Sequence, residues 1–171
     1  MHSKTDPQPR LLNGRLAEVL AGLRHGETIF VADAGMGVSP AALRPLPPHV
    51  EQLDLGVVTG VPSMGQLLPV IAVTGDIERA IVSEDLAGSN PALRAKLDET
   101  FGAAAVAEVP YYPAMYDLRD RAKLFVQTGD VTPHANVVLV GGYTSPDIAI
   151  ELLTADDPMG LFAAGTGAGG A

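Results

Sequence analysis

Short apolar runs typical of strands alternate with amphipathic segments typical of helices along most of this chain. The runs are rich in β-branched residues, and the segments between them place apolar residues at helical spacing. Because strands that alternate with helices form mainly parallel sheets, the sequence predicts a single-domain, layered α/β fold with a mostly parallel sheet. The expected strands are residues 28–32, 53–58, 77–83, 106–109, 124–126 and 137–140. The expected helices are residues 12–23, 63–70, 91–101 and 114–123.

Capping residues and prolines mark the expected helix ends. Asn13, Ser63 and Asn90 each stand at the start of a helical pattern, where their side chains can accept hydrogen bonds from free N–H groups. Pro69 is expected to end or kink the second helix. Four prolines within residues 40–48 exclude regular structure and predict a surface loop.

The two ends of the chain differ from its middle. Residues 1–10 are polar and proline-containing, which predicts a flexible arm before a domain over residues 11–145. Residues 146–171 form an acidic and then glycine-rich tail, expected to dock one apolar turn at 148–154 and to be disordered beyond about 156. Neither a secretory signal nor an 18-residue apolar run is present, so a cytoplasmic protein without a membrane partner is expected.

Composition excludes several classes of function. The 11 basic and 20 acidic residues give a net charge of −9, which argues against nucleic acid or an anionic membrane as partner. The absence of cysteine removes thiol catalysis, disulfides and thiolate metal sites. The four histidines are far apart in sequence, so no metal site is predicted. Gly35 and Gly37 follow a strand as a dinucleotide loop does, but Pro40 replaces the third glycine, so no nucleotide is expected.

Two single residues and one polar turn are candidates for chemistry. His25 stands between a helix and a strand, where it can exchange protons near neutrality or simply interact with the helix dipole. Asp33 ends a buried strand, which is where ligands bind in open α/β sheets, although it can also serve only to form a turn. Residues 128–136 place Thr132, His134 and Asn136 before the last strand, as polyol contacts or as an ordinary polar loop.

Four segments resemble, in order, those of the D-ribose pyranase family, whose sister group is the L-fucose mutarotases. They are LRH (23–25), TIFVADAG (28–35), DLGVVTGVPSMGQ (54–66) and TGDVTPHAN (128–136). The resemblance covers about residues 11–144, and the GVPS piece is closer to the ribose branch. It implies a cofactor-independent mutarotase that interconverts pyranose and furanose, or anomeric, forms of D-ribose or a similar monosaccharide. It also implies subunits assembled into a ring, such as a decamer, with sites between subunits.

The resemblance also implies roles for individual residues. His25 falls on the family's catalytic histidine, and His134 stands where the family has a tyrosine. Tyr112 takes the place of a further substrate histidine, with Tyr116 one helical turn on. The tail has no family counterpart. The expected sugar-binding residues are Asp33, Tyr112, His134, Ala135 and Asn136.

Ring opening fits these residues chemically. A base must take the anomeric proton while an acid protonates the ring oxygen, and imidazole with imidazolium fills both roles without a metal or cofactor. The departures at His134 and in the tail favour an alternative, a non-catalytic sugar-binding or regulatory module on the same scaffold.

If residues 28–32 form one strand, His25 and Asp33 lie about 26 Å apart at about 3.3 Å per residue. Both can then serve one sugar only if a second subunit completes the site.

Overall fold

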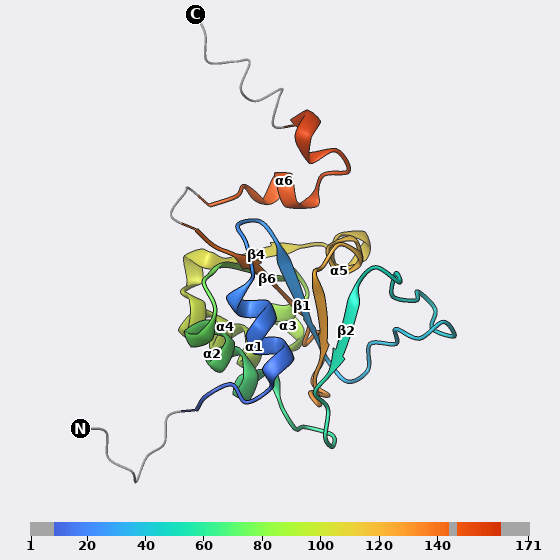
Figure 1. Ribbon diagram of the computed structural model, residues 1–171, viewed down its shortest axis with the longest axis vertical. Coiled ribbons are helices and arrows are strands. Elements are labelled where there is room, and N and C mark those ends of the chain that lie inside the picture. The colour runs from blue at the N-terminus through green and yellow to red at the C-terminus, as the bar shows by residue number, and fades with distance from the viewer. Residues whose placement is uncertain (1–8, 144–146, 162–171) are drawn as a thin grey trace, which may run out of the picture.

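The computed structural model describes residues 9–143 and 147–161 (Figure 1). The strands in this part of the chain are β1 (Thr28–Ala32), β2 (Glu51–Asp54), β3 (Ile77–Ser83), β4 (Val106–Val109), β5 (Leu124–Gln127) and β6 (Val137–Gly141). They form one sheet in the order β2-β5-β1-β6-β3-β4. β6 runs antiparallel to both neighbours, whereas the other strands all point the same way. The predicted layered α/β fold with a mostly parallel sheet is confirmed.

Helices cover both faces of the sheet. They are α1 (Gly14–Ala21), α2 (Met64–Thr74), α3 (Leu86–Ser89), α4 (Pro91–Phe101), α5 (Tyr116–Asp120) and α6 (Ile150–Thr154), with a 3-10 turn (Ala103–Ala105) and a π-helical turn (Tyr111–Met115). In Figure 1, α1, α2 and α4 lie on one side of the sheet and α5 on the other. Successive β1 residues therefore enter different cores: Ile29 and Val31 pack under α1 to α4, and Phe30 and Ala32 pack under α5.

The predicted helix caps are confirmed. The Asn13 side chain accepts a hydrogen bond from the Leu16 N–H (2.9 Å), and Asn90 caps α4, which begins with Pro91. Ser63 and Gln66 form a reciprocal capping box at the start of α2. Local sequence therefore fixes where three of the helices on one face begin.

Three predicted strands have different bounds: β5 and β6 each end one residue later than expected, and the strand expected over residues 53–58 differs most. Residues 53–58 were expected to be extended, but β2 ends at Asp54. The Asp54 carboxylate accepts a hydrogen bond from the Gly56 N–H (2.8 Å), which turns the chain out of the sheet. Val58 and Val61 then form an isolated bridge across a tight turn.

Three helices also differ from expectation. The first, expected over residues 12–23, is limited to Gly14–Ala21. α2 continues past Pro69 to Thr74, because its buried face on the sheet outweighs the one hydrogen bond that proline cannot donate. The helix expected over 114–123 is regular only in α5. Before it, Tyr112 has extended dihedrals inside the π-helical turn; after it, the Lys123 N–H already bonds to the Thr28 carbonyl (2.8 Å).

The predicted arm and the end of the tail fall largely outside the described residues. Residues 1–8 and 162–171 are not described, and neither are residues 144–146, where the boundary at 145 was placed. Within residues 147–161, Ile150 and Leu153 of α6 pack against the core under α5, and 158–161 form one further helical turn.

Among the described helices, none has the length and apolar character needed to cross a membrane.

The strand directions give the sheet two chemically distinct edges. We call the edge where β1 to β5 end the carboxyl edge; it carries Asp33 and the loop 128–136. We call the opposite edge the amino edge; it carries His25, just before β1, and α6 lies beyond it (Figure 1). The structure thus places His25 and Asp33 at opposite edges, as the strand prediction required.

Gly129 packs the carboxyl-edge loop against the turn after β2. A Cβ atom built there would overlap the backbone of Val58 and Val61, so only glycine fits without movement. The Gly129 N–H bonds to the Pro62 carbonyl (3.0 Å), which joins the two turns. The position of the loop therefore depends on residue 129 being glycine, which has no side chain.

Replacing Gly129 with alanine is expected to lower the free energy of unfolding by about 1–3 kcal/mol, because backbone must move to admit the methyl group. Urea denaturation measures the change. The matched control is Gly14→Ala at an exposed position of α1, where nothing lies within 4 Å of the added Cβ, and there stability should hold or rise by up to about 1 kcal/mol. Equal effects of the two substitutions would contradict the packing argument.

Candidate functional site

Asp33 and Asn136 form a reciprocal pair at the carboxyl edge. Asp33 follows β1 and Asn136 precedes β6, and because these strands are antiparallel neighbours the two residues meet. The Asn136 amide donates to Asp33 Oδ2 (2.9 Å), while the Asp33 N–H donates to Asn136 Oδ1 (3.2 Å). Asp33 Oδ1 also accepts from the Gly35 N–H (2.8 Å), so the turn-forming role of Asp33 is present as well. Both side chains are held before any ligand arrives.

The loop between β5 and β6 is anchored by a buried carboxylate. Asp130, 6% exposed, accepts hydrogen bonds from the Met64 N–H (2.8 Å) and from the N–H and hydroxyl of Thr132 (2.8 and 2.5 Å). The Asn90 amide donates to Thr132 Oγ1 (2.8 Å) and to the Pro133 carbonyl (3.1 Å). The starts of α2 and α4 thereby fix the loop that carries His134 and Asn136.

His134 and Ala135 face in different directions. His134 has a φ of 53°, and its ring meets the Tyr111 ring edge to face at 5.2 Å. Its buried Nδ1 has no hydrogen-bond partner among the described residues. Ala135 as a whole is fully buried in the core under α1 to α4, so it exposes no atom to a ligand, contrary to its predicted role as a sugar contact.

Tyrosines form a wall beside Asp33. The pKa of Tyr111 is raised well above its usual range, first by burial and then by the nearby Tyr116 hydroxyl and Asp33 charge, so its phenol stays a neutral donor. Tyr112 is 69% exposed and lies 6.0 Å from both the Tyr116 ring and the Arg44 guanidinium carbon. A neighbouring cavity of about 690 Å³ is lined by Tyr111, Tyr112, Tyr116, Arg44, Gly37, Ala42 and Leu43. Asp33 is not part of this lining.

Tyr111 is a site residue that the sequence reasoning missed. Tyr112 was singled out from the resemblance without gaps, but it is Tyr111 that contacts His134 and is near enough to Asp33 for that charge to contribute to its raised pKa. The available signal was its position directly after β4, because that strand ends at the same edge as β1.

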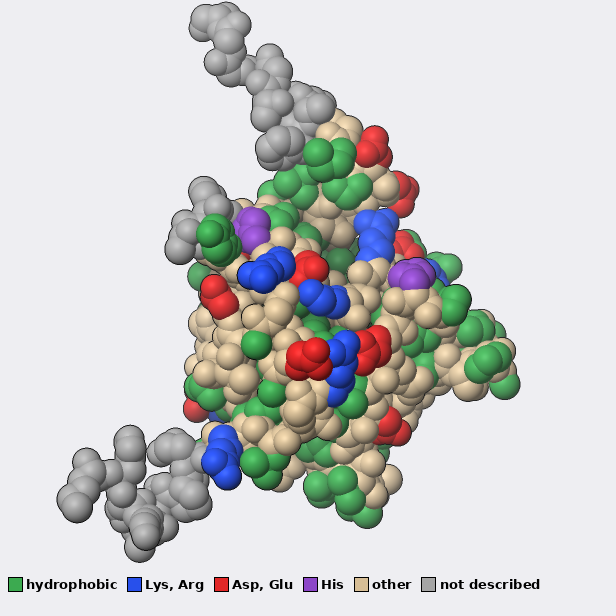
Figure 2. Space-filling view, viewed as in Figure 1, with side chains coloured by type: hydrophobic (Ala, Val, Ile, Leu, Met, Phe, Trp, Pro, Cys, Tyr) green, Lys and Arg blue, Asp and Glu red, His purple; other side chains and the backbone are tan. Residues whose placement is uncertain are grey.

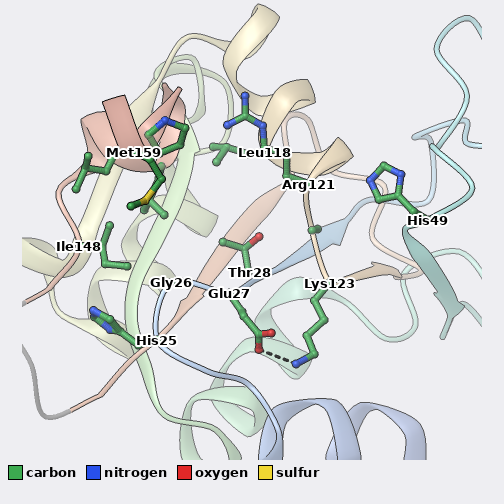
Figure 3. A pocket seen from close by; sticks show the side chains of 14 residues that line it. His25, Gly26, Glu27, Thr28, His49, Leu118, Arg121, Lys123, Ile148 and Met159 are labelled. Carbon is green, nitrogen blue, oxygen red and sulfur yellow. Dashed lines mark hydrogen bonds and ion pairs between the residues drawn. The ribbon is translucent and has the colours of Figure 1, made fainter. Parts of the chain in front are cut away.

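At the amino edge, His25 borders a larger cavity. It has a volume of about 860 Å³, and Figure 3 shows His25 and Ile148 on one side of it and Glu27 with Lys123 on another. Lys123 Nζ donates to Glu27 Oε2 (2.6 Å), and this bond holds the pKa of Glu27 below its usual value. The His25 side chain is 29% exposed, so it can reach a ligand in the cavity.

His25 faces a buried carboxylate. Its Nδ1 lies 3.1 Å from Oε2 of Glu78, whose side chain is 5% exposed. Glu78 was not singled out from the sequence, because Ile77 to Ser83 is an apolar strand in which a lone acidic residue resembles an exposed one. The cavity also includes His49, whose Nε2 lies 2.9 Å from the Asp120 carbonyl oxygen.

Charges elsewhere are paired rather than gathered. Within residues 9–143 and 147–161, no three histidine or carboxylate side chains converge as a metal ion requires. On the face in Figure 2, basic side chains lie among acidic ones instead of forming an extended basic patch. Arg15, for example, donates to Glu51 at 2.7 Å and to Glu18 at 2.7 Å.

The predicted site residues therefore fall into two groups. Asp33, His134 and Asn136 come together at the carboxyl edge with Tyr111, and Tyr112 lies at the rim of the neighbouring cavity. His25 lies at the amino edge and lines a cavity that includes none of them.

Comparison with known proteins gives matches over most of the chain. Residues 7–144 match the RbsD / FucU transport protein family. The D-ribose pyranase of Symbiobacterium thermophilum is 33% identical over 134 residues, which cover 78% of this chain and 95% of that protein. The D-ribose pyranase of Chloroflexus aggregans is 32% identical over 132 residues, covering 77% and 94%.

Solved structures agree with these matches. Bacillus subtilis RbsD, solved in complex with D-ribose, has a TM-score of 0.69 and 28% identity, covering 82% of this chain and 100% of its own. The fucose mutarotase of Streptococcus pneumoniae, solved with L-fucose, has a TM-score of 0.61 at 18% identity and covers 78% and 95%, which is a likeness of fold.

The resemblance inferred from four short segments is thus confirmed over nearly the whole described domain. The pyranases among the relatives are isomerases, so the predicted enzyme class, an isomerase of the mutarotase type, is confirmed with it. The chain belongs to the RbsD / FucU family.

Proposed function

We propose that this chain is a cofactor-independent mutarotase that interconverts the pyranose and furanose, or anomeric, forms of D-ribose or a similar monosaccharide by opening its ring. The observation that carries the proposal is the prearranged Asp33–Asn136 pair beside Tyr111, in a chain whose relatives include D-ribose pyranases. Carboxylate, amide and neutral phenol groups bind neighbouring hydroxyls of a polyol through paired hydrogen bonds.

The carboxyl edge is the sugar-binding half of this proposal. Asp33 accepts hydrogen bonds from sugar hydroxyls, and the neutral Tyr111 phenol donates one. His134 places its ring against Tyr111 where the family pattern has tyrosine, and its buried Nδ1 has no hydrogen-bond partner among the described residues. This replacement adjusts which monosaccharide fits, without altering the fixed Asp33–Asn136 pair.

The amino edge is the catalytic half. His25 removes the anomeric hydroxyl proton and, as imidazolium, returns a proton to the ring oxygen, so the C1–O bond opens to the aldehyde. Rotation about the C1–C2 bond and closure through the reverse proton transfers then give the other anomer, and closure through a different hydroxyl gives the other ring size. Proton transfer of this kind contributes about 10²–10⁴-fold to a rate.

Complete sites form between two chains in this proposal. His25 and Asp33 lie at opposite edges of one sheet, so a neighbouring chain must bring its carboxyl edge to the amino edge of the first. A head-to-tail contact of this type closes rings. The carboxyl edge of this chain exposes apolar side chains suited to such a contact: Val57, Val58 and Val131 are 77, 61 and 63% exposed.

Substituting His25 with glutamine is expected to lower the exchange rate between ring forms by about 10²–10⁴-fold, because glutamine cannot transfer protons. Glutamine retains a donor that can face Glu78, so the melting temperature and oligomer size should change little. Saturation-transfer NMR on equilibrated ribose and fucose measures exchange. Sugar binding by the unmodified protein without accelerated exchange would instead identify a non-catalytic binding module.

Mixing two inactive variants tests whether the site is shared. His25→Gln and Asp33→Asn chains should each be inactive, and co-expression in equal amounts should restore activity to about a quarter of the normal value, the fraction of random interfaces with both residues intact. Light scattering confirms that mixed oligomers have formed. If mixed oligomers show no recovery, each pocket lies within a single chain and the head-to-tail arrangement is wrong.

A further inference from the structure

The segment 147–161 lies beyond the family match yet packs over the amino edge. The match ends at residue 144, and in Figure 1 α6 stands above the start of β1. Leu153 packs against the core under α5, and the Arg121 guanidinium donates to the Ala155 carbonyl (2.8 Å). Figure 2 shows hydrophobic side chains gathered at this end of the molecule. The segment is therefore attached at the edge that carries His25.

Ile148 is the point at which this segment approaches His25. Its side chain occupies the space where a Cβ of Gly26 would lie, and Figure 3 shows Ile148 and His25 side by side. The Ile148 N–H donates a hydrogen bond to Glu78 Oε1 (3.1 Å). One carboxylate oxygen of Glu78 is thereby held by the tail.

The other carboxylate oxygen of Glu78 faces His25. Oε2 lies 3.1 Å from His25 Nδ1, which is an ion-pair distance without hydrogen-bond geometry, and neither atom has a hydrogen bond to any other described residue. A carboxylate that is 95% buried is costly unless a donor or a positive charge faces it, and the His25 ring is the group in position to do so.

This geometry selects one form of the imidazole. A carboxylate beside Nδ1 favours the tautomer with its proton on that nitrogen, which leaves the Nε2 lone pair free to accept a proton. The same carboxylate faces the ring when His25 has accepted the anomeric proton. Rotation of Glu78 about its side-chain bonds would move the carboxylate away from Nδ1. The hydrogen bond from the Ile148 N–H to the other carboxylate oxygen therefore matters, because it opposes this rotation.

We propose that Glu78 is a positioning residue for His25, and that the Ile148 N–H, supplied from outside the family match, holds Glu78 in that role. The inference rests on the proposed function for its catalytic consequence. The tail then acts on the reaction through a backbone hydrogen bond and a carboxylate, without contacting the sugar.

The experiment uses two full-length variants with matched controls. Glu78→Gln keeps the shape and can still accept from Ile148, but its amide donates to Nδ1 and favours the opposite tautomer. Its control is Glu151→Gln on the exposed side of α6. Ile148→Pro removes the N–H together with the side chain over Gly26, so it has two controls. Ile148→Ala shortens the side chain and keeps the N–H. Ala149→Pro places proline at a φ of −62° that proline adopts, where no hydrogen bond from the N–H is present among the described residues.

Two readouts are measured on each variant. Long-range ¹H–¹⁵N spectra report the tautomer of His25 without requiring activity, and NMR exchange gives kcat and KM separately. Glu78→Gln should shift the His25 proton toward Nε2 and lower kcat by between about 10-fold and 10⁴-fold, with KM nearly unchanged. Ile148→Pro should lower kcat by about 10-fold, the scale of a hydrogen bond to a charged group.

An unchanged tautomer and kcat in Glu78→Gln would overturn the role of Glu78. Equal losses in Ile148→Pro and in either of its two controls would overturn the role of the Ile148 N–H, because the tail would then act only as a wall. If the unmodified protein accelerated no sugar exchange, the proposed function would fail, yet the tautomer shift would still report on the contact between Glu78 and His25.

Discussion

The rest of the molecule depends on the position of β1, which is covered by helices on both faces of the sheet and paired with a strand on each side. All five of its residues are buried, and it pairs with β5 on one side and β6 on the other. Phe30 stacks on Phe125 at 5.7 Å in one core, while Ile29 and Val31 fill the other. A strand held in this way cannot bend, so the chemistry at its two ends stays separated, and a complete pocket has to be assembled from more than one chain in the proposed mechanism.

Much of this arrangement could be predicted from local sequence. Apolar runs gave β1, β3 and β4 with their observed bounds, and Asn13 and Asn90 gave the helix starts, because both signals act over a few residues. The end of β2 could not be predicted, since it depends on the Asp54 side chain accepting a hydrogen bond from the Gly56 N–H, two residues further along the chain. The passage through Pro69 also could not be predicted, because tertiary packing outweighs a local preference there.

Prediction of the site had the same limit. Asp33 and Asn136 were identifiable because each adjoins a strong strand signal, and their pairing follows from the antiparallel contact of those strands. Tyr111 and Glu78 were not identified from the sequence, because their proposed roles depend on neighbours distant in sequence. Tyr111 contacts His134, and Glu78 lies between His25 and Ile148. A single sequence shows the polarity of such residues but not what faces them.

The reversed direction of β6 has a consequence for local stability. It allows Asp33 and Asn136, the proposed sugar-binding residues, to adjoin β1 and β6, two adjacent central strands that are paired on both sides. His25 instead belongs to the connection between a short helix and β1, and its neighbour Gly26 has a φ of 77°. In partial opening, central strands separate last and helix ends first. Amide hydrogens near Asn136 are therefore expected to exchange more slowly than those near His25, so the proposed sugar-binding groups stay ordered in partly opened states in which the proposed proton-transfer group, His25, is not.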